Sequence, residues 1–150
     1  MENYLKTVLY AYPLLKTVGE DYAEHIRNKA VLSYNSSLKT EDLAEYLAKE
    51  ILRKNNLLWL RGAIEGVLAK LDDTERALIA ARYFGKKKIP LHKAGAQEWS
   101  ERTYFRQQQK VGEKVCGMLV AAGVTKEFFD TRLQGVELIS KIQKHVDKVK

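Results

Sequence analysis

The sequence has few of the residues on which disulfide proteins, zinc proteins and many enzymes depend. Its 150 residues include one cysteine, Cys116, and three histidines, His25, His92 and His145, which are far apart in the chain. A single cysteine forms no internal disulfide, and the isolated histidines match no zinc-ligand spacing. The sequence therefore predicts no disulfide, no metal site and no cofactor, and it favours a reducing, cytoplasmic location.

Catalytic motifs are also missing. We recognise no glycine-rich phosphate loop, no paired carboxylates and no nucleophile beside a base. Cys116 stands among Val115, Gly117 and Met118, a setting typical of a core residue. We therefore expect no catalytic residue and a protein that is not an enzyme.

Long hydrophobic runs are absent too. The apolar stretch near the N-terminus, residues 7–15, is too short to span a bilayer and lacks the cleavage site of a signal peptide. We interpret it as the packed face of a helix and expect no membrane contact. With 45% hydrophobic residues, the chain is long enough to bury a single core.

What the sequence does have is a local excess of positive charge. The net charge is +7, yet residues 1–74 carry ten Lys and Arg against eleven Asp and Glu, whereas residues 85–116 carry eight against three. A focused basic patch attracts a polyanion, whereas evenly mixed charges mainly keep a protein soluble. A solvated surface is the ordinary alternative, but the clustering favours nucleic acid as the partner.

Apolar periodicity predicts an all-α protein that begins with a long helical hairpin over residues 1–70. Spacings of three and four predict two helices joined by a loop over residues 33–38, and Pro13 should kink or interrupt the first. Thr40 is a suitable cap for the second helix. The two apolar stripes, which should pack together or against a second copy, are Leu5, Val8, Tyr12, Leu15, Gly19, Tyr22 and Ile26, and Leu43, Leu47, Ile51, Leu58, Ile64 and Leu68.

A shorter helix follows, with both of its ends recognisable in the sequence. Asp72 and Glu75 have the spacing of a capping box, and Gly85 supplies the left-handed residue that ends a helix. Its expected core face is Leu78, Ala81 and Phe84. The basic turn over residues 86–88 and a short helix over residues 90–97, which Pro90 begins, come next.

The segment after residue 98 predicts a capped helix with two different faces. Ser100 is the N-cap, and Trp99 can pack on Tyr104 as a hydrophobic staple. At 100° per residue, an apolar docking side and a polar free side separate. The docking side is Tyr104, Val111, Val115, Met118 and Leu119, and the free side is Arg102, Arg106, Gln109, Lys110 and Glu113.

The free side has the chemistry of a DNA-recognition helix. Arg102 and Arg106 can each donate two hydrogen bonds to guanine, and Gln109 can pair with adenine in the major groove. A polar face on an ordinary surface helix is the alternative, but the order of a short helix, a basic turn, a short helix and a capped helix favours a helix-turn-helix over residues 71–122. The expected phosphate-binding residues are Lys86, Lys87, Lys88, Lys93, Ser100, Thr103, Gln107 and Lys110.

The segments LDDTERALIAARYFGKKK and WSERTYFRQQQKV also carry a family resemblance. They resemble region 4 of sigma-70-type factors, and still more the small region-4-like regulators of phages and prophages in Gram-positive bacteria, including the ArpU-type regulators. The resemblance covers roughly residues 71–119 and implies base contacts by Glu101, Arg102 and Arg106. Nothing in the sequence resembles the promoter-opening parts of a complete sigma factor.

The sequence departs from the region-4 pattern at three positions. Gly95 weakens the expected first helix of the motif. Gln108 and Gly112 stand where the docking side of the recognition helix should be apolar.

The C-terminal segment, residues 123–150, restarts at Thr125 as one or two helices. Its residues Ile139, Ile142, Val146 and Val149 have the spacing of a stripe that packs on the hairpin or on a second copy. We therefore expect a homodimer or higher oligomer that binds double-stranded DNA, with RNA polymerase as a further candidate partner. The alternatives are a phage DNA-packaging subunit of the small-terminase kind and a protein-interaction module with a degenerate helix-turn-helix.

Overall fold

The computed structural model describes residues 2–32, 40–85 and 99–148, and within these ranges it contains helices and no strands. The helices are α1 Asn3–Leu32, α2 Thr40–Ala69, α3 Asp73–Tyr83, α4 Glu101–Ala121, α5 Lys126–Arg132 and α6 Glu137–Lys148. The predicted all-α class is confirmed. The loop predicted over 33–38, the basic turn over 86–88 and the short helix over 90–97 lie outside the described residues. In the described ranges, no helix is both long and apolar enough to cross a membrane.

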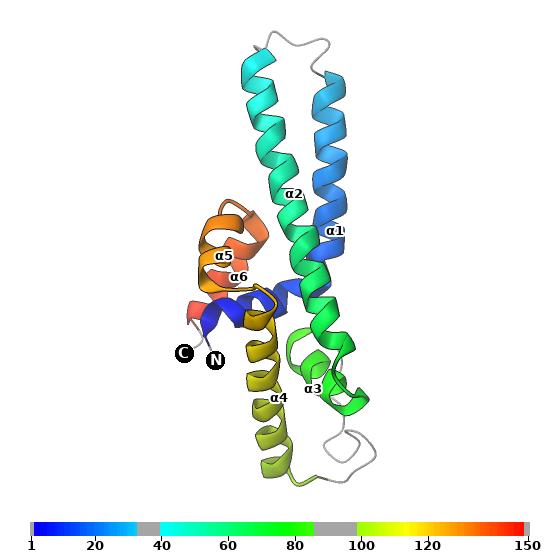
Figure 1. The fold of residues 1–150 in the computed structure, drawn as a ribbon, viewed down its shortest axis with the longest axis vertical. Coiled ribbons are helices and arrows are strands. Elements are labelled where there is room, and N and C mark those ends of the chain that lie inside the picture. Colours follow the sequence, from blue (N-terminus) through cyan, green and yellow to red (C-terminus); the bar gives the residue numbers. More distant parts are fainter. Residues whose placement is uncertain (1, 33–39, 86–98, 149–150) are drawn as a thin grey trace.

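Helices α1 and α2 pack side by side as the predicted antiparallel hairpin (Figure 1). The first part of α1, dark blue in Figure 1, runs across the molecule, whereas the rest runs along its long axis. Proline removes one helical hydrogen bond and crowds the preceding turn, which is a common cause of such a bend. Pro13 lies inside α1, which remains one uninterrupted helix.

The apolar stripe predicted for α1 faces the interior, but the stripe predicted for α2 was only partly correct. On α1, Leu5, Val8, Leu15 and Gly19 are buried. On α2, Ile51 and Leu58 are 43% and 44% exposed, and the buried apolar residues are Leu57, Leu60, Ile64 and Val67. The apolar residues between Ile51 and Leu60 point to all sides of the helix, so neighbouring helices rather than periodicity decide which of them are covered.

The other helices gather around one end of the hairpin. Helix α6 packs on α1, and Asn3 Nδ2 donates a hydrogen bond to Asp147 Oδ1 at 3.1 Å, so that the first and last helices meet (Figure 1). The restart at Thr125 is confirmed, because its hydroxyl accepts a hydrogen bond from the backbone N–H of Phe128 at 3.1 Å. Buried Ile139 and Val146 confirm the packed side of α6, and a continuous apolar core includes residues of all the described helices.

Candidate nucleic-acid interface

Helix α3 begins at the predicted capping box. The Asp72 carboxylate accepts a hydrogen bond from the backbone N–H of Glu75 at 2.8 Å, and the Glu75 carboxylate accepts one from the backbone N–H of Asp72 at 3.1 Å. Gly85 has a φ of +65°, which confirms the left-handed residue after the helix. The core face was only partly correct: Leu78 is buried, Ala81 and Phe84 are partly buried, and the sequence analysis missed buried Ile79 and Tyr83.

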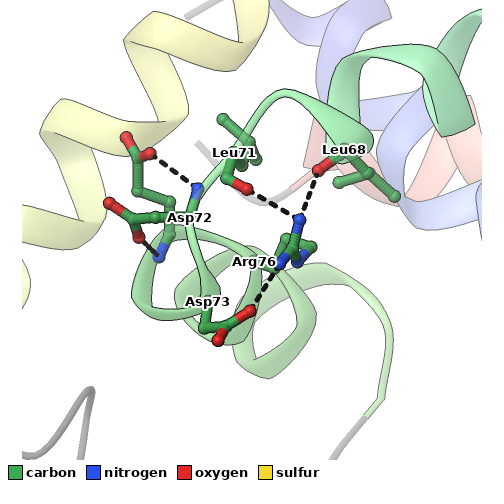
Figure 2. A network of polar contacts seen from close by, with 6 residues as sticks. Leu68, Leu71, Asp72, Asp73 and Arg76 are labelled. Carbon is green, nitrogen blue, oxygen red and sulfur yellow. Dashed lines mark hydrogen bonds and ion pairs between the residues drawn. The ribbon is translucent and has the colours of Figure 1, made fainter.

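Arg76 fastens α3 to the end of α2, as Figure 2 shows. Its Nη1 donates hydrogen bonds to the backbone carbonyls of Leu68 at 3.2 Å and Leu71 at 2.7 Å, and its Nη2 pairs with Asp73. The last carbonyls of a helix have no partner within that helix. Arg76 supplies a further donor to Leu68, in the last turn of α2, and so links α3 to the end of the hairpin.

Two polar contacts connect α3 to α4. Lys114 Nζ lies 2.8 Å from Glu75 Oε2, and this hydrogen bond is the main reason that the pKa of Glu75 is below its usual value. Arg82 Nη1 donates a hydrogen bond to Gln108 Oε1 at 3.4 Å. Gln108 and Gly112, the two departures on the docking side, are both buried, and Arg82 supplies the partner that buried Gln108 needs.

The start of α4 has the predicted cap and staple. The backbone N–H of Thr103 donates to Ser100 Oγ at 3.2 Å, and the Ser100 hydroxyl in turn donates to Thr103 Oγ1 at 2.9 Å. The rings of Trp99 and Tyr104 lie 6.5 Å apart, centroid to centroid. The entry angle of α4 is therefore set by contacts that precede its first turn.

The two sides of α4 separate as predicted. Tyr104, Val111, Val115 and Leu119 are buried, and Met118 is partly buried. The whole predicted free side is exposed, as is Glu101, whereas Thr103 and Gln107 are partly buried at its edges. We use the name recognition face for five exposed residues of the first turns, Arg102, Phe105, Arg106, Gln109 and Lys110. Glu101, at the start of the helix, is also exposed but is not included in this name.

Phe105 is the member of this face that the sequence analysis missed. It is 54% exposed, the most exposed of the large hydrophobic residues that the structure describes. Its ring contacts the buried ring of Tyr104 edge-on, with 5.6 Å between the centroids. The helical wheel could have found it, because 100° per residue places Phe105 about 40° from Gln109 and about 60° from Arg102, next to the predicted free side.

The recognition face is positively charged and long enough for a groove contact. In the described part of the chain, Arg102, Arg106 and Lys110 form no ion pair, so their charges face solvent. Residues 102–110 span roughly 12 Å along the helix axis. The expected phosphate ligands Lys86, Lys87, Lys88 and Lys93 lie outside the described residues.

The described cysteine and histidine side chains give no sign of a catalytic or metal site. Burial raises the pKa of the Cys116 thiol to about 11, so the thiol stays protonated at neutral pH and is a core group, as predicted. His25, for which the sequence indicated no partner, lies 2.6 Å from the Tyr46 hydroxyl. The described residues contain no group of three or more His, Cys, Asp or Glu side chains that could hold a metal.

Comparisons with protein-family models, with curated proteins and with solved structures find no match to this chain.

Proposed function

We propose that this chain is a sequence-specific DNA-binding transcription regulator of phage or prophage origin, and that α4 enters the major groove. One observation supports the proposal most: the first turns of α4 expose three cations, an amide and an aromatic ring on one side, while the opposite side is buried against the protein. The major groove admits an α-helix, and such a helix contacts bases with its N-terminal residues.

In this proposal, the residues of α4 have separate roles. Arg102 and Arg106 donate paired hydrogen bonds to guanines, and Gln109 pairs with adenine. Lys110 and the capped helix start bind phosphates, together with Gln107. Glu101 lies in the first turn, where its negative charge interacts favourably with the positive end of the helix dipole, and it is the third candidate for a base contact. Helices α3 and α4 would be the outer helices of a region-4-like helix-turn-helix.

Phe105 adds an apolar contact to this scheme. An aromatic side chain in the major groove packs on the methyl group of thymine, a contact that carries sequence information without a hydrogen bond. In the monomer the Phe105 ring is exposed to water, so the protein alone does not gain the free energy of burying it. Contact with DNA would cover the ring and make that free energy available for binding. We therefore expect a thymine in the half-site, close to the guanine that Arg102 or Arg106 contacts.

The position of the interface is compatible with a dimer. The N-terminal end of α4 lies at the opposite end of the molecule from the tip of the hairpin (Figure 1). A second copy, or RNA polymerase, can therefore bind the hairpin without covering the recognition face. Two copies would contact half-sites separated by about one turn of DNA, roughly 34 Å.

Selection from a random duplex library, followed by fluorescence anisotropy over a salt series, tests the proposal. We expect a defined sequence to be enriched, and the logarithm of the affinity to fall linearly with the logarithm of the salt concentration, with a slope of about −0.9 per phosphate contacted. Arg102→Ala and Arg106→Ala should each reduce discrimination by about 1 to 3 kcal/mol at one base pair.

Arg27→Ala is the matched control, because Arg27 is exposed on α1 in the hairpin. It should leave both the affinity and the enriched sequence unchanged. If the wild-type chain binds no duplex at low salt, the proposal is wrong. A ring of many copies with little sequence preference would instead favour the packaging alternative.

A second experiment isolates Phe105. Replacing the expected thymine by deoxyuridine removes only the methyl group, and this should weaken binding by the wild type but not by Phe105→Ala. Equal losses in both proteins would show that Phe105 does not contact that methyl group.

A further inference from the structure

A groove between α1, α3 and α6 combines an apolar surface with a basic rim. Its volume is about 530 Å³, which lies within the range of small-molecule sites. The apolar part consists of Tyr10 and Leu14 on α1 and of Ile142 and Val146 on α6. The remaining lining residues are Lys6, Arg82, Lys141 and His145. Among the residues that the structure describes, no acidic side chain lines the groove.

The apolar part is incompletely covered by the protein itself. Tyr10 and Leu14 are 40% and 47% exposed, although their neighbours Leu9, Ala11 and Leu15 are buried in the core. Exposed apolar surface in a concave site is covered favourably by a ligand with an apolar body. From Lys6 to Leu14, the groove follows about two turns of α1, roughly 12 Å.

The cations of the rim keep binding capacity for an anion. Lys141 pairs with Glu137 at 3.0 Å, but both side chains are more than 70% exposed, and such a pair exchanges readily with solvent and ligands. Arg82 donates a long hydrogen bond to Gln108 Oε1 at 3.4 Å and lies over the ring of Tyr83, 5.5 Å from its centroid. A guanidinium has five donors, so these contacts leave Arg82 able to bind an anion as well. A planar guanidinium also binds a carboxylate with two parallel hydrogen bonds.

We propose that this groove binds a small amphipathic carboxylate, with the apolar body on Tyr10, Leu14 and Val146 and the carboxylate on the basic rim that includes Arg82 and Lys6. The proposal rests on the shape, exposure and charge of the groove and does not depend on DNA binding. The groove lies on helices α1, α3 and α6, whereas the recognition face lies on α4.

Isothermal titration with decanoate and with 4-phenylbutyrate, below their aggregation limits, tests the groove directly. We expect saturable binding of at least one of them, at least tenfold tighter than binding of decanol, which lacks the charge, or of butyrate, which lacks most of the apolar body. Backbone amide shifts in an NMR titration should be confined to α1, α3 and α6.

Variants of the rim separate specific binding from general affinity for the surface. Arg82→Gln and Lys6→Gln should each weaken binding at least fivefold, whereas Lys16→Gln and Lys144→Gln, exposed on α1 and α6 outside the groove, should not change it. Circular dichroism and the melting temperature check that each variant is folded. Leu14→Gln, which keeps the charges, should weaken decanoate binding and leave the fold intact because Leu14 is 47% exposed.

Three results would overturn the proposal. In the first, neither carboxylate shows saturable binding. In the second, decanoate and decanol bind equally tightly, and in the third, the rim variants and the control variants lose the same amount of affinity. Binding of an acidic amphipathic peptide but of neither carboxylate would also overturn it, because the groove would then be a protein-docking site.

Discussion

The two ends of the hairpin differ in how they are stabilised. The base, residues 3–15 and 57–69, contributes eleven buried residues, among them Leu9, Leu57, Leu60 and Ile64. In the arm, residues 16–32 and 40–56, only Gly19 and Glu50 are buried among the side chains that the structure describes. The same two helices thus provide a packed core at one end and a two-helix projection at the other (Figure 1).

The difference follows from the number of neighbours. In the base, α1 and α2 pack on each other, and in addition α1 packs on α3 and α6 and α2 packs on α4. Most of the arm has a single partner helix (Figure 1). One partner can cover only one stripe, which leaves residues such as Tyr22 and Leu47 partly buried. The base therefore carries the stability that holds α4 in place, and the arm is the region left available for association.

The largest expected effect on the free energy of unfolding comes from shortening a buried leucine of the base. An isoleucine of the arm, on the same helix, serves for comparison. Leu60 is fully buried, so Leu60→Ala should lower the free energy of unfolding by about 2 to 5 kcal/mol. Ile51 is 43% exposed, and Ile51→Ala should cost less than about 1 kcal/mol. Urea denaturation measures both. A large loss for Ile51→Ala that depends on protein concentration would show that a second copy covers the arm.

The second largest effect is expected for the buried carboxylate of Glu50, on α2 close to where the arm meets the base. Arg53 Nη1 lies 2.8 Å from Glu50 Oε1, and the Glu50 side chain is 8% exposed. Arg53→Met keeps the aliphatic stem but leaves the buried carboxylate without this partner, which should cost about 1 to 3 kcal/mol. Lys54→Met, at the next position, is the control and should cost much less in the same urea experiment. Equal losses would mean that Glu50 finds another partner.

A smaller, pH-dependent effect is expected at the contact between α3 and α4. Glu75→Gln preserves the capping box, since glutamine also serves at that position, but removes the ion pair with Lys114. The loss should be about 0.5 to 1 kcal/mol at pH 7. Because the folded state lowers the pKa of Glu75, this stabilisation is present above the ordinary value of 4.5 and is lost as the pH falls through the lower folded value.

Urea curves at pH 7 and pH 3 measure this dependence. The difference in unfolding free energy between wild type and Glu75→Gln should be smaller at pH 3 than at pH 7, because pH 3 lies below the ordinary pKa of 4.5 and the stabilisation from a lowered pKa decreases there. A difference that stays constant between the two pH values would contradict the role of the ion pair.

The smallest effect is expected for an ion pair of the arm. Lys49 Nζ and Glu45 Oε1 are 3.4 Å apart, and their side chains are 65% and 69% exposed. Glu45→Gln should change the free energy of unfolding by at most about 0.5 kcal/mol. A loss larger than that of Glu75→Gln would reverse the comparison between arm and base.

Local signals in the sequence were sufficient to predict where α3 and α4 begin. A cap, a staple and a capping box depend on residues within one turn of each other, so Ser100, Trp99 and Asp72 could be assigned from spacing alone. The burial of Val111 and Val115 followed because the opposite side of α4 is polar. Region-4-like DNA recognition and its partners stay predictions.

Features that depend on several helices could not be predicted in this way. Leu57 and Leu60 were missed because α2 carries apolar residues on all sides and its neighbours select among them. The partner of Gln108 comes from Arg82, on another helix. The groove likewise draws its residues from three helices that are distant in the sequence.

The contact between Asn3 and Asp147, 144 residues apart, has a consequence for the order of folding. During synthesis, the arm helices can pair as soon as α2 has left the ribosome, since their contacts are close in sequence. The first part of α1 must wait for α6, its packing partner, until almost all of the described chain has been made. We therefore expect nascent chains that end before Glu137 to present the apolar side of α1, with Leu5 and Leu9, to chaperones.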